Sequence, residues 1–270
     1  MTLTRRFQAL LGWLSYRYHL FWADTLRNSN EMLERQAETF RKHGLDRVAG
    51  LNRIDMACRE LFGKGYDEND GMYSEHLVIL AAVSVSPHYR IKSILEIGTF
   101  DGRTAAILSK LFSGAEIVTV DLPDVAEDLI GTYDRKLVVD QFISSRNGLL
   151  SRFPAVSFHQ MNSVKLAEWA NDAFDLIWID GAHGYPVVAM DIINSLRLAK
   201  GGGLILIDDV WTDLKVSDPI YSSLGAYESL LALESAGLIP SFELFLKRLH
   251  PCYNVPRSKK FVGWFVKPLH

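Results

Sequence analysis

The sequence is poor in cysteine and has little net charge, and both features narrow what the chain can be. Its two cysteines, Cys58 and Cys252, stand far apart and belong to no metal-binding spacing. They are most simply free thiols in a reducing compartment, so we expect a cytoplasmic protein. The formal net charge of −3 offers no broad attraction to nucleic acid or to an anionic membrane. We therefore expect no nucleic-acid partner.

A long apolar run is also missing. The apolar stretch that follows Arg5-Arg6 is broken at Arg17, too soon for the roughly 20 apolar residues that span a bilayer. We therefore expect no integral membrane span. Apolar residues at helical spacing from Arg5 to Leu26 instead predict a helix that packs on its own domain or on a second copy of the chain, which would make a homo-oligomer.

What is present is a change of pattern near residue 86. Residues 1–85 show helical spacing without strand alternation, and we expect them to form an N-terminal helical cap. Residues 86–270 alternate short apolar strands with helices, which indicates a parallel sheet covered on both faces. Strands are expected at 94–97, 116–120, 156–160, 174–179, 203–207, 241–249 and 260–267.

The last two predicted strands are joined by only a short loop with prolines, so they must pair antiparallel. The predicted fold is α/β, a doubly wound, mostly parallel, seven-stranded Rossmann-like sheet with an antiparallel C-terminal hairpin. Two local expectations accompany it. Ser74 could cap the helix that contains residues 77–82, and segment 124–154 should place a helix over the site or against the cap.

The most informative stretch is 93–104, a buried strand that ends in a glycine turn and opens a helix. It carries an acid, Glu96, among apolar residues, and a buried carboxylate is costly unless something binds it. Gly98 and Gly102 are spaced G-x-x-x-G, with Phe100 where the dinucleotide fingerprint requires its second glycine. This spacing argues against a bound pyrophosphate and favours a smaller nucleoside with an amino-acid tail.

Polar residues close the next two strands. Asp121 could accept hydrogen bonds from ribose hydroxyls or cap a helix, because Leu122-Pro123 follows it. Taken with Glu96 and the glycine turn, the ribose role is favoured. Asn162-Ser163 closes the third strand and could cap the following helix, a role that leaves it free to line a ligand site as well.

The strongest local signal is Asp180-Gly-Ala-His183, where an acid at a strand end is followed by a glycine turn and a histidine. Because strands four and five are adjacent in this topology, Asp180 should converge with Asp208-Asp209. Three crowded carboxylates repel one another unless they are protonated or bridged by a cation. Hard oxygen ligands favour Mg²⁺, although a simple capping role for Asp208 or Asp209 is the alternative.

These motifs resemble those of the class I S-adenosylmethionine-dependent methyltransferases. Within that class they look like the metal-dependent O-methyltransferases of the macrocin and macrolide-sugar type, over roughly residues 74–266. The resemblance implies that Asp180, Asp208 and Asp209 bind the metal and that His183 is the general base. The catechol type has an Asp-Asn pair in place of Asp208-Asp209, which weakens a catechol assignment.

The same resemblance implies S-adenosylmethionine as the cofactor, with position 162 beside the adenine. Its expected contacts are Glu96, Gly98, Thr99, Phe100, Asp101, Gly102, Asp121, Leu122, Asn162, Ser163 and Asp180.

The leading hypothesis is therefore metal-assisted O-methylation of a hydroxylated small molecule, such as a sugar, glycoside or natural product. Bound Mg²⁺ would lower the pKa of the acceptor hydroxyl and His183 would take its proton. A second hypothesis is a metal-independent N- or carboxyl-methyltransferase. A nicotinamide-dependent oxidoreductase is disfavoured by the glycine spacing and the terminal hairpin, and a non-catalytic S-adenosylmethionine-binding protein by the presence of His183 and the acids.

Overall fold

A computed structural model describes residues 29–68, 70, 72–131, 138–214, 222–249 and 259–269. The predicted helix between Arg5 and Leu26, and with it the expected contact to a second copy, lies outside these residues, as does Cys252. The helices are α2 (Ser29–Lys42), α3 (Arg47–Phe62), α4 (Glu75–Val85), α5 (Arg103–Leu111), α6 (Glu127–Gly131), α7 (Val139–Leu150), the 3₁₀ helix η2 (Ser163–Glu168), α8 (Val187–Leu198) and α9 (Gly225–Ser235).

The strands form one seven-stranded sheet in the order β3-β2-β1-β4-β5-β7-β6. They are β1 (Ser93–Ile97), β2 (Glu116–Asp121), β3 (Val156–Gln160), β4 (Phe174–Ile179), β5 (Ala199–Val210), β6 (Glu243–Leu246) and β7 (Phe261–Val266). The first five are parallel, and β7 pairs antiparallel with both β5 and β6. The predicted fold class is confirmed, including its antiparallel C-terminal hairpin.

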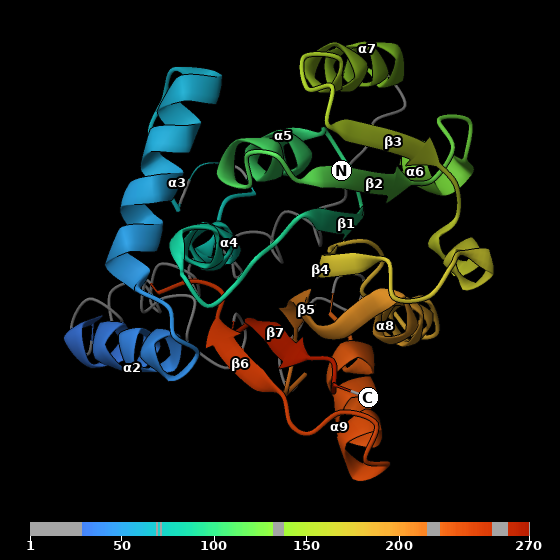
Figure 1. The fold of residues 1–270 in the computed structure, drawn as a ribbon. Coiled ribbons are helices and arrows are strands. Elements are labelled where there is room, and N and C mark those ends of the chain that lie inside the picture. Colours follow the sequence, from blue (N-terminus) through green and yellow to red (C-terminus); the bar gives the residue numbers. More distant parts are fainter. Residues whose placement is uncertain are drawn as a thin grey trace, which may run out of the picture.

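Helices cover both faces of the sheet (Figure 1). Side chains alternate along the central strands, so that Leu176 and Trp178 of β4 join the core under α3, α4 and α5. Ile177 and Ile179 of the same strand join the core under α8 and α9. The order of the strands reverses between β1 and β4, and a doubly wound sheet binds its ligands at the carboxyl ends of the strands flanking such a reversal.

The helices that precede the sheet share its core. α4 is apolar on all sides and buried along most of its length, as expected of a helix enclosed between α3 and the sheet. Asp46 caps α3 by accepting hydrogen bonds from two backbone amides of its first turn, and Gly63 ends that helix in a left-handed conformation. The boundary placed at residue 85 between a cap and a second domain stays a prediction.

Three local expectations are corrected. Ser74 precedes α4 but makes no capping hydrogen bond, because its hydroxyl contacts Nδ1 of His76 at 2.6 Å instead. β5 continues to Val210 rather than ending at Ile207, since a bulge lets it keep pairing with β7. The strand expected over 241–249 is confined to β6.

The described residues of segment 124–154 include α6, which borders the cleft described below, and α7, which packs against α5, away from α2 and α3. The buried Arg146 of α7 fixes this segment through an ion pair with Asp124 at 2.8 Å. The predicted helical spacing of residues 142–153 corresponds to α7, which does not line the cleft, whereas α6, which does, was not predicted.

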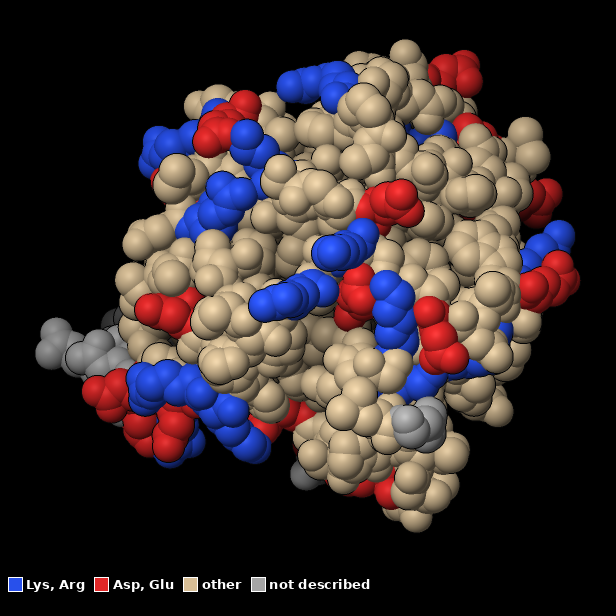
Figure 2. All heavy atoms as spheres, viewed as in Figure 1, with Lys and Arg blue, Asp and Glu red and all other residues tan. Residues whose placement is uncertain are grey.

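The surface carries no dominant charge on the face shown in Figure 2, where acidic and basic side chains are interspersed. Among the described residues, every helix is too short or too polar to cross a membrane.

Candidate active site

The carboxyl ends of β1, β2, β4 and β5 open into one cleft of about 1600 Å³. Nearly all of the residues predicted for the site line it: Gly98, Thr99, Phe100, Asp101, Asp121, Leu122, Asn162, Ser163, Asp180, His183, Asp208 and Asp209. Glu96 and Gly102 lie behind this lining, so their expected contacts to a cofactor remain predictions.

The glycine turn after β1 forms one wall. Gly98 has φ +103° and Gly102 has φ +78°, backbone conformations that side chains rarely adopt. Phe100, between them, also has a positive φ, and its amide donates a hydrogen bond of 2.7 Å to Oδ2 of Asp121. The other oxygen of Asp121 accepts from the amide of Leu122 at 2.8 Å. The carboxylate at the end of β2 therefore holds the turn at the end of β1 in place.

Glu96 lies fully buried behind this turn. Its Oε2 accepts a hydrogen bond from the Thr119 hydroxyl at 2.5 Å, and that hydroxyl is also 2.6 Å from the hydroxyl of Thr99. Its other oxygen, Oε1, has no partner among the described residues. Burial raises the pKa of Glu96 to about 8. Through Thr119 and Thr99, the acid is connected to the cleft without touching it.

Asn162 caps the following helix, which is one of the two roles predicted for it. Its Oδ1 accepts a hydrogen bond from the amide of Val164 at 3.0 Å, at the start of η2. Asn162 also lines the cleft, so the cap is compatible with a ligand contact.

Three acids converge on the opposite wall, as the strand order predicted. Asp180 follows β4, while Asp208 and Asp209 lie in a bulge of β5 at which the register with β7 shifts. Asp209 has φ +50°, and this strained backbone brings its side chain into the cleft beside that of Asp208. Burial and the charge of Asp208 raise the pKa of Asp180 well above its ordinary value.

Two lysines that the sequence analysis did not predict enter this cluster. Nζ of Lys247 lies 2.5 Å from Oδ2 of Asp208 and is also paired with Oδ1 of Asp209. Nζ of Lys260 lies 2.6 Å from Oδ2 of Asp209. Burial works against charge at Asp209, but Lys247 and Lys260 hold its pKa below its ordinary value. Asp208 and Asp209 are thus paired with positively charged groups of the protein itself.

His183 faces the same acids from the loop after β4. Its Nε2 lies 3.8 Å from Oδ1 of Asp180 and 3.9 Å from Oδ2 of Asp209, at separations longer than hydrogen bonds. Burial lowers the pKa of His183, only partly offset by the charges of Asp209 and Asp208. The lowered pKa favours the unprotonated imidazole, which is the form that can accept a proton.

A second histidine, His76, lines the cleft and was also missed. It comes from the first turn of α4 and stacks on Trp178, with ring centroids 5.0 Å apart. Burial lowers its pKa to about 4. The sequence offered one signal for it, a histidine in an otherwise apolar helix, but only the fold brings α4 to the ends of β4 and β5.

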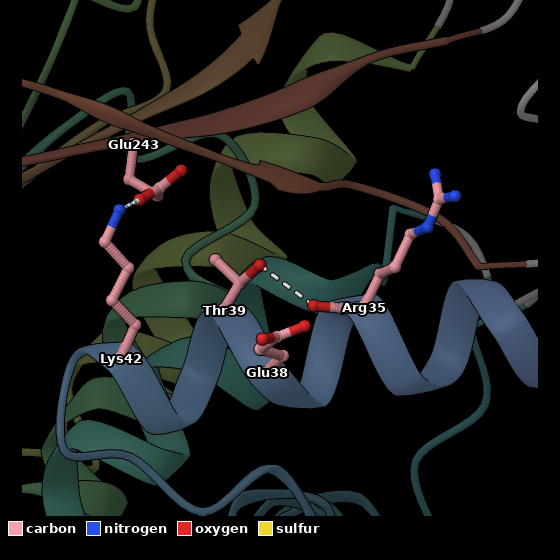
Figure 3. A pocket seen from close by; sticks show the side chains of 5 residues that line it. All are labelled: Arg35, Glu38, Thr39, Lys42 and Glu243. Carbon is pink, nitrogen blue, oxygen red and sulfur yellow. Dashed lines mark hydrogen bonds and ion pairs between the residues drawn. The ribbon is translucent and has the colours of Figure 1, made fainter.

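A separate hollow lies on the surface between α2 and β6 (Figure 3). Lys42 of α2 points across it and pairs with Glu243 of β6, while the Thr39 hydroxyl donates to the carbonyl of Arg35 at 3.0 Å. Arg35 pairs with Glu31 on its own helix. These side chains form ion pairs and hydrogen bonds with their own neighbours on an open surface. We therefore do not consider this hollow a candidate active site.

Residues 95–210 match a family described as a methyltransferase domain. This range runs from β1 to the end of β5 and contains the glycine turn, Asp121, Asp180 and both acids of the bulge. No curated protein matches the sequence.

Solved structures match over most of the chain at low identity. The O-methyltransferase TomG from Streptomyces achromogenes, involved in tomaymycin synthesis and solved with S-adenosylmethionine, is 17% identical with a TM-score of 0.50, over 87% of this chain and 98% of that one. A putative O-methyltransferase from Klebsiella pneumoniae is 20% identical with a TM-score of 0.45, over 81% and 90%. Cofactor-bound Rv0187 from MTB is 20% identical with a TM-score of 0.47, over 82% and 89%.

Proposed function

We propose that this chain, which carries a class I S-adenosylmethionine-dependent methyltransferase domain, transfers a methyl group to a hydroxyl oxygen of a small molecule. The observation that carries the proposal is the position of His183, a neutral imidazole among acids in the same cleft as the glycine turn and Asp121. Suitable acceptors are hydroxylated compounds such as a sugar, a glycoside or another natural product. The match to a methyltransferase domain supports this reading over a nicotinamide-dependent oxidoreductase.

The cofactor wall suits a cationic nucleoside. Acidic side chains border the cleft near the glycine turn, among them Asp101, Asp121 and Asp128. S-adenosylmethionine, when bound, supplies an activated methyl group on a positively charged sulfur. Asp121 keeps lone pairs for ribose hydroxyls while it holds the amides of Phe100 and Leu122, and Asn162 closes the far side.

The acceptor wall supplies positioning and a base. His183 can remove the proton of an acceptor hydroxyl as the oxygen attacks. The lysine pairs hold Asp208 and Asp209 in place beside His183. Holding an acceptor in line with a methyl donor accounts for much of the rate enhancement expected of such an enzyme.

A divalent metal ion fits the predicted set of three acids poorly. Both oxygens of Asp209 are in ion pairs with lysines, and Lys247 also occupies Oδ2 of Asp208. Asp180, His183 and Asp208 do bring donor atoms within 4.8 Å of one another, which makes them the remaining candidate ligands. We therefore assign no step of the reaction to a metal. The same ion pairs favour a reaction without a metal, which keeps methylation of a nitrogen or a carboxylate as the alternative to methylation of a hydroxyl.

Calorimetry with S-adenosylmethionine, and separately with NAD, tests the proposal. We expect binding of S-adenosylmethionine alone, and the formation of S-adenosylhomocysteine when hydroxylated acceptors are screened. Binding of NAD without binding of S-adenosylmethionine would reject the proposal. Turnover with amines or carboxylic acids only would replace O-methylation by the alternative.

A further inference from the structure

We propose that the ammonium group of Lys247 is the resident cation of this cleft, holding Asp208 and Asp209 in place of a divalent metal ion. Methyl transfer by this protein would then need no metal. The role of Lys247 in catalysis rests on the proposed function, whereas its effect on metal binding can be measured independently.

The fold fixes the backbone of Lys247 firmly. The residue directly follows β6, and its amide donates a hydrogen bond of 3.0 Å to the carbonyl of Lys260, which precedes β7. Its carbonyl accepts a hydrogen bond of 2.9 Å from the amide of Glu75, the first residue of α4. Lys247 is therefore anchored between the C-terminal hairpin and α4, with its side chain directed at the ends of β4 and β5.

The ammonium group is buried and fully committed to acids. Lys247 is 8% exposed, and its Nζ bridges Oδ2 of Asp208, at 2.5 Å, and Oδ1 of Asp209. An ammonium held between Asp208 and Asp209 thus offsets the repulsion between these crowded carboxylates.

An ammonium in this position competes directly with a metal ion. Mg²⁺ binds carboxylate oxygens at about 2.0–2.1 Å, and the bridging oxygens of both acids already face Nζ. A metal bound to the same carboxylates would stand a few ångström from a second cation and be repelled by it. Lys260, on the outer oxygen of Asp209, adds a further positive charge.

Lys247 is accordingly a positioning residue that acts through Asp208 and Asp209. Breaking a buried ion pair by removing one partner leaves an uncompensated charge, which attracts another cation. Replacing the lysine by a neutral side chain should therefore open a metal site at Asp180, His183 and Asp208, beside the freed oxygen of Asp209. Such a gain of binding would not follow if Lys247 were only a packing residue.

The test is a titration with Mn²⁺ followed by electron paramagnetic resonance, on protein with and without S-adenosylmethionine. We expect the wild-type chain to leave Mn²⁺ free up to about 1 mM, the range of the weakest calcium sites in proteins. Lys247→Gln should bind Mn²⁺ more tightly, by about tenfold or more, because Asp208 loses its lysine partner and Asp209 keeps only Lys260. Lys247→Arg, which keeps the charge, should behave like the wild type.

Lys267→Gln is the matched control. Lys267 is also buried and paired with an acid, Asp172, at 2.6 Å, but it lies outside the cleft, so this variant should gain no Mn²⁺ binding. Tight Mn²⁺ binding by the wild type would overturn the proposal, whatever the variants do. Failure of a folded Lys247→Gln to gain binding would overturn it as well. A failure of the proposed function would show separately, as absent S-adenosylmethionine binding in calorimetry.

Discussion

Gly98 and Asp180 are in backbone contact: a β-carbon on Gly98 would stand 2.2 Å from the carbonyl oxygen of Asp180. The amide of Asp180 donates a hydrogen bond of 2.7 Å to the carbonyl of Ile97, so the turns after β1 and β4 are joined at two points. The glycine turn that lines the cleft and the loop that carries His183 are therefore held against each other through their backbones.

Replacement of Gly98 by alanine should damage both turns at once. The new methyl group meets backbone, which cannot move aside, and φ +103° is unfavourable for any side chain. We expect a loss of roughly 1–3 kcal/mol in the free energy of unfolding from overpacking, with a further cost from the backbone conformation. Urea unfolding would measure the loss, and calorimetry should show weakened binding of S-adenosylmethionine.

Gly148→Ala is the control for this variant. Gly148 lies inside α7 with no atom within 4 Å of the position of a β-carbon, so alanine there should leave stability unchanged or raise it slightly. Equal stability of the two variants would show that the contact between Gly98 and Asp180 carries no strain.

The local sequence pattern was sufficient to predict the strands, most of the helices and the acids at the strand ends. Alternating strands and helices predicted the sheet, and acids at strand ends predicted that Asp180 would meet Asp208 and Asp209. Lys247 was missed because it contacts Asp208 across 39 positions of sequence, and the predicted hairpin did not fix the register that brings it beside the end of β5. The bulge at Asp209 was missed for a related reason, since it depends on how β5 continues beside β7.

His76 shows a second limit of prediction from sequence, a side chain whose contacts depend on the tertiary fold. The pattern Ser74-Glu-His76 reads as the start of a helix, and capping by Ser74 was the natural expectation. In the structure the hydroxyl of Ser74 turns to the imidazole instead, because α4 is enclosed and His76 stacks on Trp178. Local helix and capping propensities cannot predict that tertiary contact.

Glu96 should make stability depend on pH. Its pKa is raised to about 8 in the folded chain by burial, whereas the unfolded chain titrates near 4.5. The folded state therefore holds a proton that the unfolded state has lost, and stability should fall as pH rises between these values. The expected slope is at most about 1.4 kcal/mol per pH unit.

Urea unfolding of Glu96→Gln and of the wild type at pH 5.5 and pH 8 tests this expectation. The amide cannot ionise, so the variant should gain stability relative to the wild type as the pH rises. Glu116→Gln, at the exposed start of β2, should not. A constant difference between Glu96→Gln and the wild type at both pH values would contradict the raised pKa.

Asp121→Ala should weaken cofactor binding. The change removes the acceptor for the amides of Phe100 and Leu122 and any hydrogen bonds to ribose. The expected cost is about 1–3 kcal/mol of binding free energy, measured by calorimetry. Asp175 offers a matched control, because it accepts from the amides of Lys92 and Ser93 outside the cleft. Asp175→Ala should lower stability and leave the affinity unchanged, and equal losses of affinity would refute a local role for Asp121.

His183→Ala should lower kcat by about 10²–10⁴-fold if His183 is the base. Binding of S-adenosylmethionine should change little, because the wall formed by Gly98 and Asp121 is intact. A base works only when unprotonated, and burial lowers the pKa of His183, so activity of the wild type should fall off on the acidic side below pH 6.5. In the variant this acidic limb should disappear. His159→Ala, on the exposed edge strand β3, should match the wild type.

The pH profile also separates His183 from the other histidine of the cleft. Burial lowers the pKa of His76 to about 4, so a reaction that used His76 as its base would lose activity only near that pH. A His183→Ala variant with wild-type kcat and an acidic limb near pH 4 would move the role to His76. If kcat falls and the limb near pH 4 is absent from the wild type, proton removal belongs to His183, because among the described residues these two supply the imidazoles that line the cleft.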